Sequence, residues 1–347
     1  MTITAVKLNQ FTAFRRLELE ASRGINIFIG ANGTGKTHLL KVIYAACDIT
    51  RTKVSLPEKL LRVFLPYQRN LGRLVYRQPG TARGTIEVYR DALRIRASFS
   101  NHWRTARLAT VTGAKEWSAT TIECAYLPVK EMLAHAPGFR SLYTAREIHF
   151  EEIYADIVDR AYRPPLRGRP PLHEPVHATR QRLLRLIQKA MDGRVVTQGE
   201  EFFLQNKQGN LEFTLVAEGM RKLALLLLLI QNGTLLQGAV LCWDEPEANL
   251  NPRLIGMVVD ILLELQRMGV QVFLATHDYV VLKEFDLRKQ ANDAVRFHAL
   301  FRDAETGEMA MHSTDDYLAI HPNAIADTFM DLYDRDVERA LSGRGKE

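Results

Sequence analysis

Apolar residues follow two patterns along the chain, and the first is an alternation of short apolar runs with amphipathic segments. Runs with the length of buried strands occupy residues 24–29, 120–127, 239–243 and 270–276. Apolar residues recur at helical spacing in the segments around them, namely 37–49, 53–64, 219–231, 254–267, 279–284 and 322–341. Alternation of buried strands with helices is typical of a mostly parallel sheet covered by helices, so we predict an α/β fold.

The second pattern is a strict alternation of apolar and polar residues, which predicts half-buried strands. It occurs at residues 73–76, 84–89 and 93–98, where glycines or short polar turns separate the segments. We expect these segments to form an antiparallel sheet beside the parallel one. Other strands are expected in three places: two strands in 1–29 with a turn near 21–24, a hairpin at 194–216, and a hairpin at 294–313.

Residues 129–192 interrupt both patterns. Helical spacing at 147–162 and 177–191 flanks a proline- and arginine-rich stretch at 163–171, which can be neither regular helix nor regular sheet. No heptad pattern is sustained here, so we expect a short helical insert instead of a coiled coil. The chain then divides into an amino-terminal part (1–128), the helical insert (129–192) and a carboxyl-terminal part (193–347).

A glycine-rich loop joins the strand at 24–29 to the helix at 37–49, and its sequence fits the pattern G-x-x-x-x-G-K-[ST]. The residues of this loop are Gly30, Ala31, Asn32, Gly33, Thr34, Gly35, Lys36 and Thr37. Glycines let backbone N–H groups turn toward phosphate oxygens, and the start of the helix favours an anion. Lys36 would reach the β- and γ-phosphates, and Thr37 would offer its hydroxyl to Mg²⁺. The loop therefore predicts a site for ATP and Mg²⁺.

Two acids end the apolar strand at 239–243, and a histidine ends the strand at 270–276. At the carboxyl end of a parallel strand, Asp244 would reach the shell of Mg²⁺, while Glu245 would polarise the attacking water. His277 would hydrogen-bond the γ-phosphate or hold that water. Downstream of a phosphate-binding loop, this arrangement predicts ATP hydrolysis.

Several motifs carry a resemblance to a known group of ATPases. Asn32 within the loop resembles the ABC-type branch of P-loop ATPases, and Phe11-Thr12-Ala13-Phe14 resembles the amino-terminal lobe of RecF-like, SMC-like and OLD-like ATPases. Tyr126-Leu127-Pro128 resembles a stretch of OLD-like ATPases. The sequence D-E-P-E-A-N-L-N-P at 244–252 is similar to the D-E-P-E-x-x-L-x-P pattern of the same proteins.

This resemblance implies a P-loop NTPase with an ABC-type head domain and a homodimer that holds ATP between two heads. Gly219 stands where the ABC signature belongs, although Ala217 and Glu218 depart from the family pattern S-G-G. Gly219 and Asn251 would contact the nucleotide bound by the opposite subunit.

Some polar residues near these motifs have open roles. Gln68 and Gln78 both fit the Q-loop of such ATPases by position, and neither has a persuasive context. Arg15 and Arg16 could touch phosphates, or they could lie on an exposed strand edge.

The net charge of +6 mildly favours an anionic partner, and basic residues crowd the insert. They are Arg160, Arg163, Arg167, Arg169, Arg180, Arg182, Arg185 and Lys189. Arg182, Arg185 and Lys189 share one helical face, which would suit the phosphates of nucleic acid. A protein partner, or a solvated face balanced by nearby carboxylates such as Glu147, are the alternatives.

Other features bound the function. Three cysteines at no metal-like spacing suit a reducing cytosol, the amino terminus has no signal-peptide layout, and the apolar run at 223–230 is too short to span a bilayer. We therefore expect a cytoplasmic protein. His173 and His177 have i, i+4 spacing, but Pro175 lies between them, so we expect no metal site there. No carboxylate cluster resembles a nuclease centre, which predicts an ATPase without its own effector.

These features predict an ATPase that dimerises around ATP and acts as a switch or scaffold. Compact members of the group without a coiled coil resemble ATPases of bacterial anti-phage systems, which implies a separate nuclease or toxin as effector. The second hypothesis is a DNA repair or recombination ATPase that binds DNA directly. The third, the ATPase subunit of a membrane transporter, is disfavoured because residues 217–221 differ strongly from a transporter signature.

Overall fold

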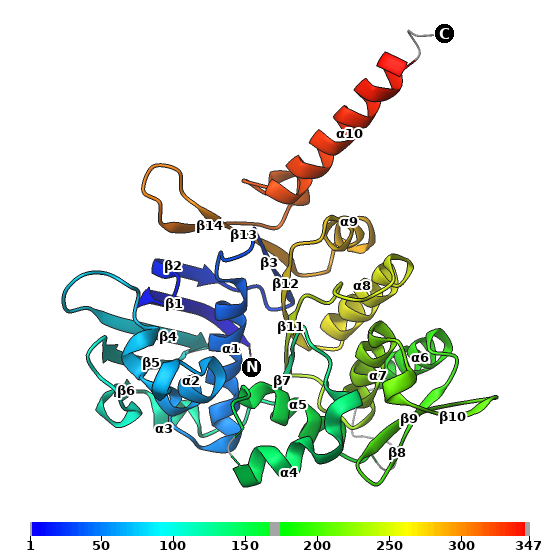
Figure 1. The fold of residues 1–347 in the computed structure, drawn as a ribbon, viewed down its shortest axis with the longest axis horizontal. Helices are drawn as coiled ribbons and strands as arrows, with labels where there is room; N and C mark the ends of the chain where they lie inside the picture. Colours follow the sequence, from blue (N-terminus) through cyan, green and yellow to red (C-terminus); the bar gives the residue numbers. More distant parts are fainter. Residues whose placement is uncertain (1, 147, 167–173, 344–347) are drawn as a thin grey trace.

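The centre of the computed structural model, which describes residues 2–146, 148–166 and 174–343, is a six-stranded sheet of order β14-β13-β3-β12-β11-β7 (Figure 1). Its strands are β3 (Ile25–Ile29), β7 (Cys124–Leu127), β11 (Val240–Asp244), β12 (Gln271–Thr276), β13 (Val295–Arg302) and β14 (Met309–Thr314). Neighbouring strands are parallel except β14, which pairs antiparallel with β13. This confirms the predicted mostly parallel sheet.

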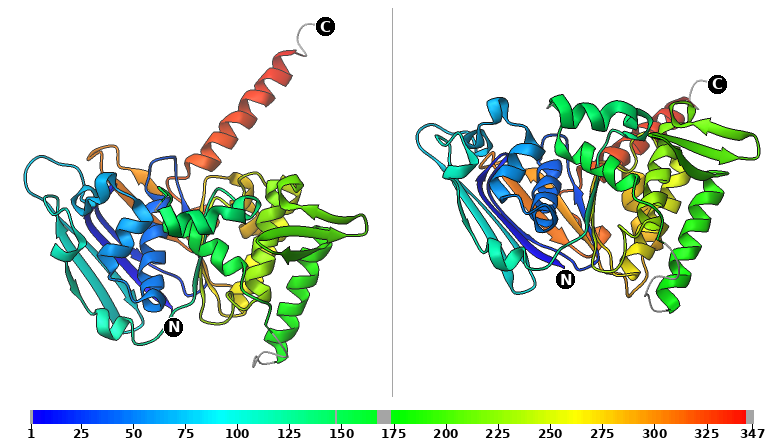
Figure 2. Two further views of the ribbon diagram at one scale, coloured as in Figure 1. Left: turned by 60° about the horizontal axis from the view of Figure 1, so that its bottom comes forward. Right: turned by 90° about the horizontal axis from the view of Figure 1, so that it is seen from below.

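The second sheet is antiparallel and has the order β2-β1-β4-β5-β6. Its strands are β1 (Ile3–Phe11), β2 (Phe14–Glu20), β4 (Arg83–Arg90), β5 (Leu93–Ser100) and β6 (Thr110–Thr112). Helix α1 (Lys36–Thr52) lies between the two sheets, where its apolar residues join one buried cluster with side chains of both (Figure 2). The antiparallel sheet beside the loop is therefore also confirmed.

The opposite face of the parallel sheet is covered by helices. They are α7 (Glu218–Gln231), α8 (Pro252–Arg267) and α9 (Tyr279–Arg288). Side chains alternate along the strands, so that Leu241 and Trp243 pack toward these helices while Val240 and Cys242 pack toward α1. Both faces of the sheet are thus buried, which explains the continuous apolar runs of its strands.

Two expected strands differ in the structure. Residues 1–29 form three strands, because the β1–β2 hairpin turns at Thr12 and Ala13 and the segment near 21–24 crosses to the other sheet. The expected strand at 73–76 is wrong, because Leu71–Leu74 is a 3-10 helix and Val75 makes a single bridge to Phe11.

The insert and the segment after it hold more elements than expected. The helices are α4 (Ala136–Arg146), α5 (Glu152–Ala161) and α6 (Glu174–Ala190), and the strands are β8 (Arg194–Gln198), β9 (Glu201–Asn206) and β10 (Gly209–Glu212). Helix α4 was not predicted, and the expected hairpin at 194–216 has a third strand. The basic residues Arg167 and Arg169, the histidine His173 and the acid Glu147 lie outside the described residues.

The remaining helices are α2 (Leu56–Phe64), α3 (Ala114–Trp117) and α10 (Ala324–Gly343). Helix α10 projects from the body of the molecule and is the final helix that the sequence predicts (Figure 1). Within the described ranges, none of the helices combines the length and apolar character needed to cross a membrane.

Candidate functional site

The glycine loop follows the carboxyl end of β3 and leads into α1, as its sequence predicts. Gly30, Gly33 and Gly35 have φ values of 149°, 82° and 95°, which side-chain-bearing residues rarely adopt. A Cβ atom on Gly35 would lie 2.4 Å from the ring of Phe14. The ring of Phe14, at the start of β2, therefore packs directly against the backbone of Gly35. This contact gives one aromatic residue of the Phe11-Thr12-Ala13-Phe14 motif a structural role.

Lys36 lies over the loop at the start of α1. Its Nζ donates to the carbonyl oxygens of Gly30, at 2.6 Å, and Ala31, at 3.1 Å. Burial lowers the pKa of Lys36, and the charges of Glu245 and Asp244 oppose that shift. The ammonium is thus held where the loop and the acids of β11 meet.

Asp244 ends β11 and is buried beside Thr37. It takes a side-chain hydrogen bond from Thr37 and another from Tyr126, whose hydroxyl lies 3.1 Å from Oδ2. Burial raises the pKa of Asp244, and these two hydrogen bonds act against that rise. The hydroxyl and the carboxylate expected at Mg²⁺ therefore lie side by side, and both are oxygen ligands of the kind Mg²⁺ prefers.

Glu245 and His277 come together at the ends of neighbouring strands. The backbone at Glu245 has a φ of 49°, and its N–H donates to the carbonyl oxygen of Ala275 at 2.9 Å. Nδ1 of His277 lies 3.3 Å from Oε1 of Glu245. The unusual backbone turns the Glu245 side chain from the strand toward the histidine.

Glu247 is a buried acid whose part in this group the sequence analysis missed. Its Oε1 accepts from the hydroxyl of Thr276, at 2.8 Å, and from the backbone N–H of His277, at 3.2 Å. Burial raises the pKa of Glu247. The D-E-P-E stretch of the sequence contains this acid. Glu247 lies three residues after Asp244, and the structure places its carboxylate at the end of β12.

Gly219 and the loop at 249–251 meet within one chain. A Cβ on Gly219 would lie 2.6 Å from the carbonyl oxygen of Asn249, so only glycine fits at this contact. Lys222, one turn along α7, donates to the carbonyl oxygen of Ala248 at 2.7 Å. Asn251 caps α8 by accepting from the N–H of Arg253 at 3.0 Å. Their contact with a second subunit stays a prediction.

The residues with open roles have partners or positions of their own. Arg15 pairs with Glu308, and Arg16 pairs with Glu18 at 2.8 Å. Both arginines lie on β2, an edge strand of the antiparallel sheet, and a contact of either with phosphates stays a prediction. Gln68 and Gln78 lie in the segment between α2 and β4, outside the parallel sheet.

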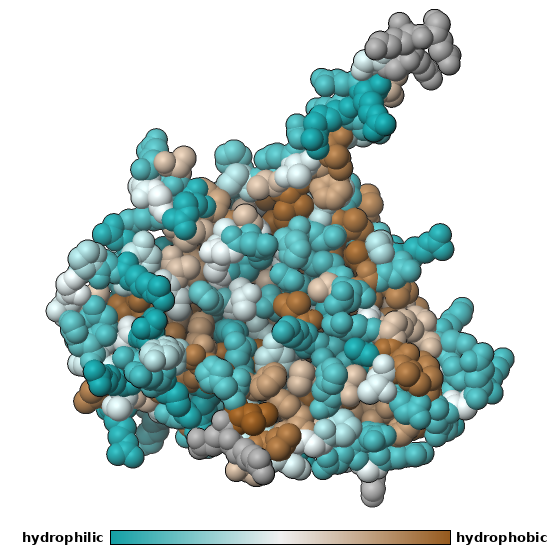
Figure 3. Space-filling view, in the orientation of Figure 1, coloured by the Kyte–Doolittle hydropathy of each residue, from teal (hydrophilic) through white to brown (hydrophobic). Residues whose placement is uncertain are grey.

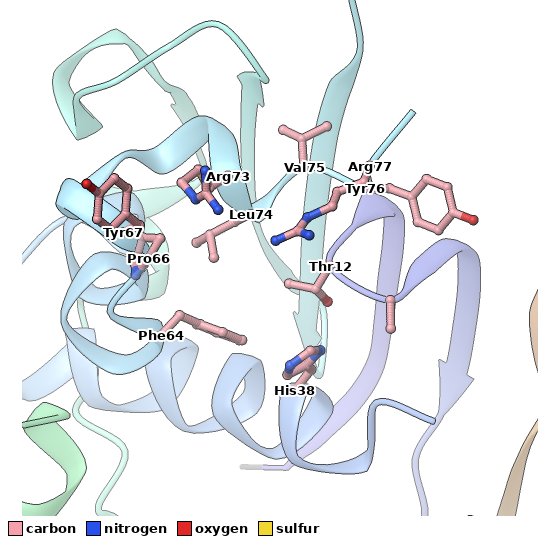
Figure 4. A pocket seen from close by; sticks show the side chains of 11 residues that line it. Thr12, His38, Phe64, Pro66, Tyr67, Arg73, Leu74, Val75, Tyr76 and Arg77 are labelled. Atoms are coloured by element: carbon pink, nitrogen blue, oxygen red, sulfur yellow. The ribbon is translucent and has the colours of Figure 1, made fainter. Parts of the chain in front are cut away.

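A cavity of about 550 Å³ adjoins the first turn of α1. Its lining residues come from the β1–β2 turn, α1, the end of α2 and the segment before β4 (Figure 4). Thr12 and His38 face it from one side and Arg73 and Arg77 from the other. Burial lowers the pKa of His38 to about 4, so the imidazole is neutral at pH 7. His38 directly follows Thr37, which sets this cavity beside the loop.

Most described basic residues of the insert are used in the structure itself. Arg160 is buried and pairs with Asp48 at 3.2 Å and Asp156 at 2.7 Å. Arg180 donates to the carbonyl oxygens of Ile230 and Gln231 at the end of α7.

The expected basic stripe of α6 lies on the exposed side of that helix. Arg182 pairs with Glu264 of α8 at 2.5 Å. Arg185 and Lys189 remain exposed. All three cations of the predicted stripe therefore lie on the surface, with Arg182 also in an ion pair, and a role for them in binding nucleic acid stays a prediction.

Comparison with known proteins gives a family match and two kinds of relative. A family model described as "AAA domain, putative AbiEii toxin, Type IV TA system" matches residues 60–283, about two thirds of the chain. The DNA replication and repair protein RecF of Streptococcus suis (strain 05ZYH33) is 27% identical over 113 residues, which are 33% of this chain and 30% of that protein. RecF of Cytophaga hutchinsonii is 49% identical over 47 residues, 14% of this chain and 12% of that protein. The matches thus span less than a third of these relatives.

Two solved structures share the fold over nearly the whole chain. An SMC head bound to the C-terminal winged-helix domain of ScpA has a TM-score of 0.56 and 13% identity, covering 92% of this chain and 100% of that chain. An SMC head domain with an extended coiled coil, bound to the C-terminal domain of ScpA derived from Pyrococcus furiosus, has a TM-score of 0.52 and 12% identity, covering 96% and 99%. At these identities the likeness concerns the fold alone.

Proposed function

The chain belongs to the AAA family described as "AAA domain, putative AbiEii toxin, Type IV TA system", as an ABC-type P-loop ATPase of the RecF/SMC/OLD group, and we propose that it hydrolyses ATP between two copies of itself. The observation that carries this proposal is the meeting of Lys36, Thr37 and Asp244 at the carboxyl edge of the parallel sheet. One strand supplies the loop and another supplies the acid, so the fold brings together residues that lie far apart in the sequence.

The loop is proposed to hold the phosphates of ATP. Its positive-φ glycines let the backbone N–H groups turn inward, and Lys36 would add a positive charge, which the neighbouring carboxylates favour and burial opposes. Thr37 and Asp244 would hold Mg²⁺, which neutralises charge on the β- and γ-phosphates when bound. Tyr126 orients the Asp244 carboxylate toward Thr37 through its hydrogen bond. The neutral His38 and the cavity beside it would accommodate the nucleoside.

Glu245 is proposed to polarise the attacking water. The strained backbone of Glu245 fixes the direction of its side chain, and the His277 imidazole lies within 3.3 Å of it. Glu247 would position His277, because its carboxylate holds the backbone N–H of that residue. Water activation by a carboxylate held in this way is a common contribution to phosphoryl transfer.

A second copy of the chain is proposed to complete the site. Gly219 and the loop at 249–251 form a joint surface at the start of α7, where Ala217 and Asn251 are exposed. The amino terminus of a helix favours the negative charge of a γ-phosphate. A dimer that closes on ATP and opens after hydrolysis would serve as a switch, because ATP would bind the closed state more tightly.

This switch is proposed to act on a separate effector, a nuclease or toxin, in anti-phage defence. The family description, which names a putative toxin of a toxin–antitoxin system, supports a defence role. The SMC head of known structure binds ScpA, which supports the idea of a head with a protein partner. Co-purification of neighbouring gene products with the ATP-locked protein tests this role. Recovery of a nuclease or toxin in the ATP-bound form alone is the expected result, and recovery of repair proteins would contradict it.

The second candidate function is a DNA repair or recombination ATPase. It is favoured by the sequence likeness to RecF, a DNA replication and repair protein. Stimulation of ATP turnover by DNA in the absence of any partner protein would support it over the effector switch.

The ATP site is tested with Lys36→Ala. Removing the charge above the loop should lower ATP affinity at least tenfold in titration calorimetry, since ion-paired hydrogen bonds contribute about 1.5–3 kcal/mol. Lys115→Ala is the matched control, because Lys115 is an exposed lysine on α3 and should leave affinity unchanged. Equal affinity for wild type and Lys36→Ala would refute the site.

A further inference from the structure

Two segments of the antiparallel lobe form one continuous surface. Residues 66–83 run up to the first residue of β4, and residues 101–109 follow β5. Backbone hydrogen bonds join them, from the N–H of Leu71 to Arg104 O at 3.1 Å and from the N–H of Gly72 to Trp103 O at 2.8 Å. Six arginines on these segments are exposed, and we call five of them the arginine surface, leaving out Arg69, which is ion-paired: Arg73, Arg77, Arg83, Arg104 and Arg107.

The arginine surface has almost no negative charge near it in sequence. Residues 60–86 contain no Asp or Glu, and neither do residues 92–115. Arg69, at the edge of the surface, pairs with Glu58 at 3.1 Å. Within residues 2–146, 148–166 and 174–343, no carboxylate lies within ion-pair distance of the five arginines. This surface differs in that respect from the basic insert, whose described arginines are largely paired or bonded.

Aromatic rings hold two of these arginines in place. The guanidinium of Arg73 lies 5.6 Å from the ring centre of Tyr67, and that of Arg83 lies 5.4 Å from the ring centre of Trp103. Tyr67 itself is 68% exposed, which is unusual for a large aromatic side chain. Nε of Arg83 also donates to the Ser98 hydroxyl at 2.7 Å. A guanidinium held in this way can present its remaining N–H groups in its own plane, so little side-chain freedom is lost when it binds an anion.

We propose that the arginine surface binds the phosphodiester backbone of nucleic acid. Uncompensated positive charge supplies the affinity, because each neutralised phosphate releases counterions. The cations are all arginines, whose planar donors match phosphate oxygens in pairs. The exposed Tyr67 and the partly exposed Trp103 offer faces on which bases can stack.

The surface is also connected to the ATP site. The N–H of Tyr76 donates to Gln10 O at 2.9 Å, and the N–H of Thr12 donates to Leu74 O at 2.8 Å. These bonds attach the arginine segment to the β1–β2 turn, whose Phe14 packs on Gly35 of the loop. Binding to the arginine surface needs no nucleotide, however, so its test is independent of the proposed ATPase activity.

The test uses the full chain without nucleotide and replaces two arginines that lie outside the cavity. Arg104→Gln with Arg107→Gln should weaken binding of a fluorescent DNA duplex and of its single strand at low salt. The slope of log affinity against log salt should fall by about 1.8 for the duplex and about 1.4 for the single strand, because each lost contact removes ~0.9 or ~0.7. A larger loss on the single strand than on the duplex at equal salt would identify unpaired bases as the favoured form.

The matched control is Arg185→Gln with Lys189→Gln, which removes two of the exposed cations of α6. It makes the same change in net charge and should leave the salt slope unaltered. The proposal is overturned if the arginine-surface variant keeps the wild-type slope, or if the α6 variant lowers the slope as much. It is also overturned if the arginine-surface variant loses affinity for polyglutamate while its affinity for DNA is intact.

Tryptophan fluorescence provides a second measurement. Trp117 and Trp243 are buried, whereas Trp103 is partly exposed beside Arg83. Stacked bases should quench the emission of Trp103, and Trp103→Phe should abolish that quenching while it keeps the wild-type salt slope. Unchanged wild-type emission at saturating oligonucleotide would contradict stacking at this surface.

Discussion

Replacement of Gly35 by alanine tests how the β1–β2 hairpin shapes the phosphate loop. Gly35 has a φ of 95°, and the added Cβ would lie 2.4 Å from the Phe14 ring. The backbone conformation costs about 1–2 kcal/mol for a residue with a side chain. Crowding against a buried ring costs about 1–3 kcal/mol more, because Phe14 is fully buried and cannot turn away freely. We expect Gly35→Ala to lower the free energy of unfolding by about 2–5 kcal/mol.

Gly33→Ala separates the two costs. Gly33 has a φ of 82°, and nothing lies within 4 Å of a Cβ built on it. This variant should therefore lose only the backbone part, about 1–2 kcal/mol. On the face of the molecule shown in Figure 3, hydrophilic and hydrophobic residues are interspersed.

The assay is urea unfolding of both variants, together with ATP affinity by calorimetry. Combining Gly35→Ala with Phe14→Leu removes the ring that meets the new Cβ, so the double variant should recover about 1–3 kcal/mol relative to the sum of the single changes. Gly35→Ala should also weaken ATP binding more than Gly33→Ala, because the crowding displaces the start of α1. If the two glycine variants lose equal stability, or if Phe14→Leu gives no recovery, the hairpin does not press on the loop.

Three further predictions concern Glu245, the ATP-dependent dimer and a buried histidine. Glu245→Gln should keep ATP affinity while turnover falls by about 10²-fold or more, since an amide cannot act as a general base. Light scattering should then show a doubled mass with ATP, which Ala217→Glu on the exposed start of α7 should prevent; an unchanged mass with ATP contradicts the dimer. Burial lowers the pKa of His298 to about 3, so the folded state resists protonation and stability is lost as pH falls below about 6.5. His298→Gln should remove about 1.4 kcal/mol of that loss per pH unit between pH 6.5 and 5, while His312→Gln on the exposed face of β14 should not.

The sequence predicted elements whose structure depends on neighbouring residues, and it failed where pairing with a distant segment decides the structure. The loop at 30–37 could be predicted because its glycines meet a local requirement. Gly30, Gly33 and Gly35 have positive φ angles, and the strand and helix on either side are adjacent in the sequence. The expected strand at 73–76 has the right alternation, but a strand also needs a partner. Only Val75 finds one, while Leu71 and Gly72 bond to the segment at 103–104 instead. That choice depends on residues about 30 positions away, which periodicity does not contain.

The charges of the insert cannot be interpreted from the local sequence, whereas those of the arginine surface can. The insert has many arginines, but Arg160 is neutralised by Asp48, 112 positions earlier in the chain. No local count can show such a pairing. The arginine surface is the opposite case, because the absence of acids at 60–86 is a local property that the sequence itself contains. A count of both signs along the chain would have found it.

Contacts between α1 and the region of α5 connect the insert to the ATP site. Lys41 of α1 pairs with Glu151 at 2.5 Å, and Tyr44 of α1 donates to Asp156 of α5 at 2.9 Å. The first turn of α1 holds Lys36 and Thr37, so the same helix contacts the phosphate loop and α5. Removing one partner from a buried group of charges leaves the other uncompensated, which costs about 3–5 kcal/mol. A displacement of α5 relative to α1 would break these contacts and carry that energetic cost. We therefore expect the two helices to move as one unit.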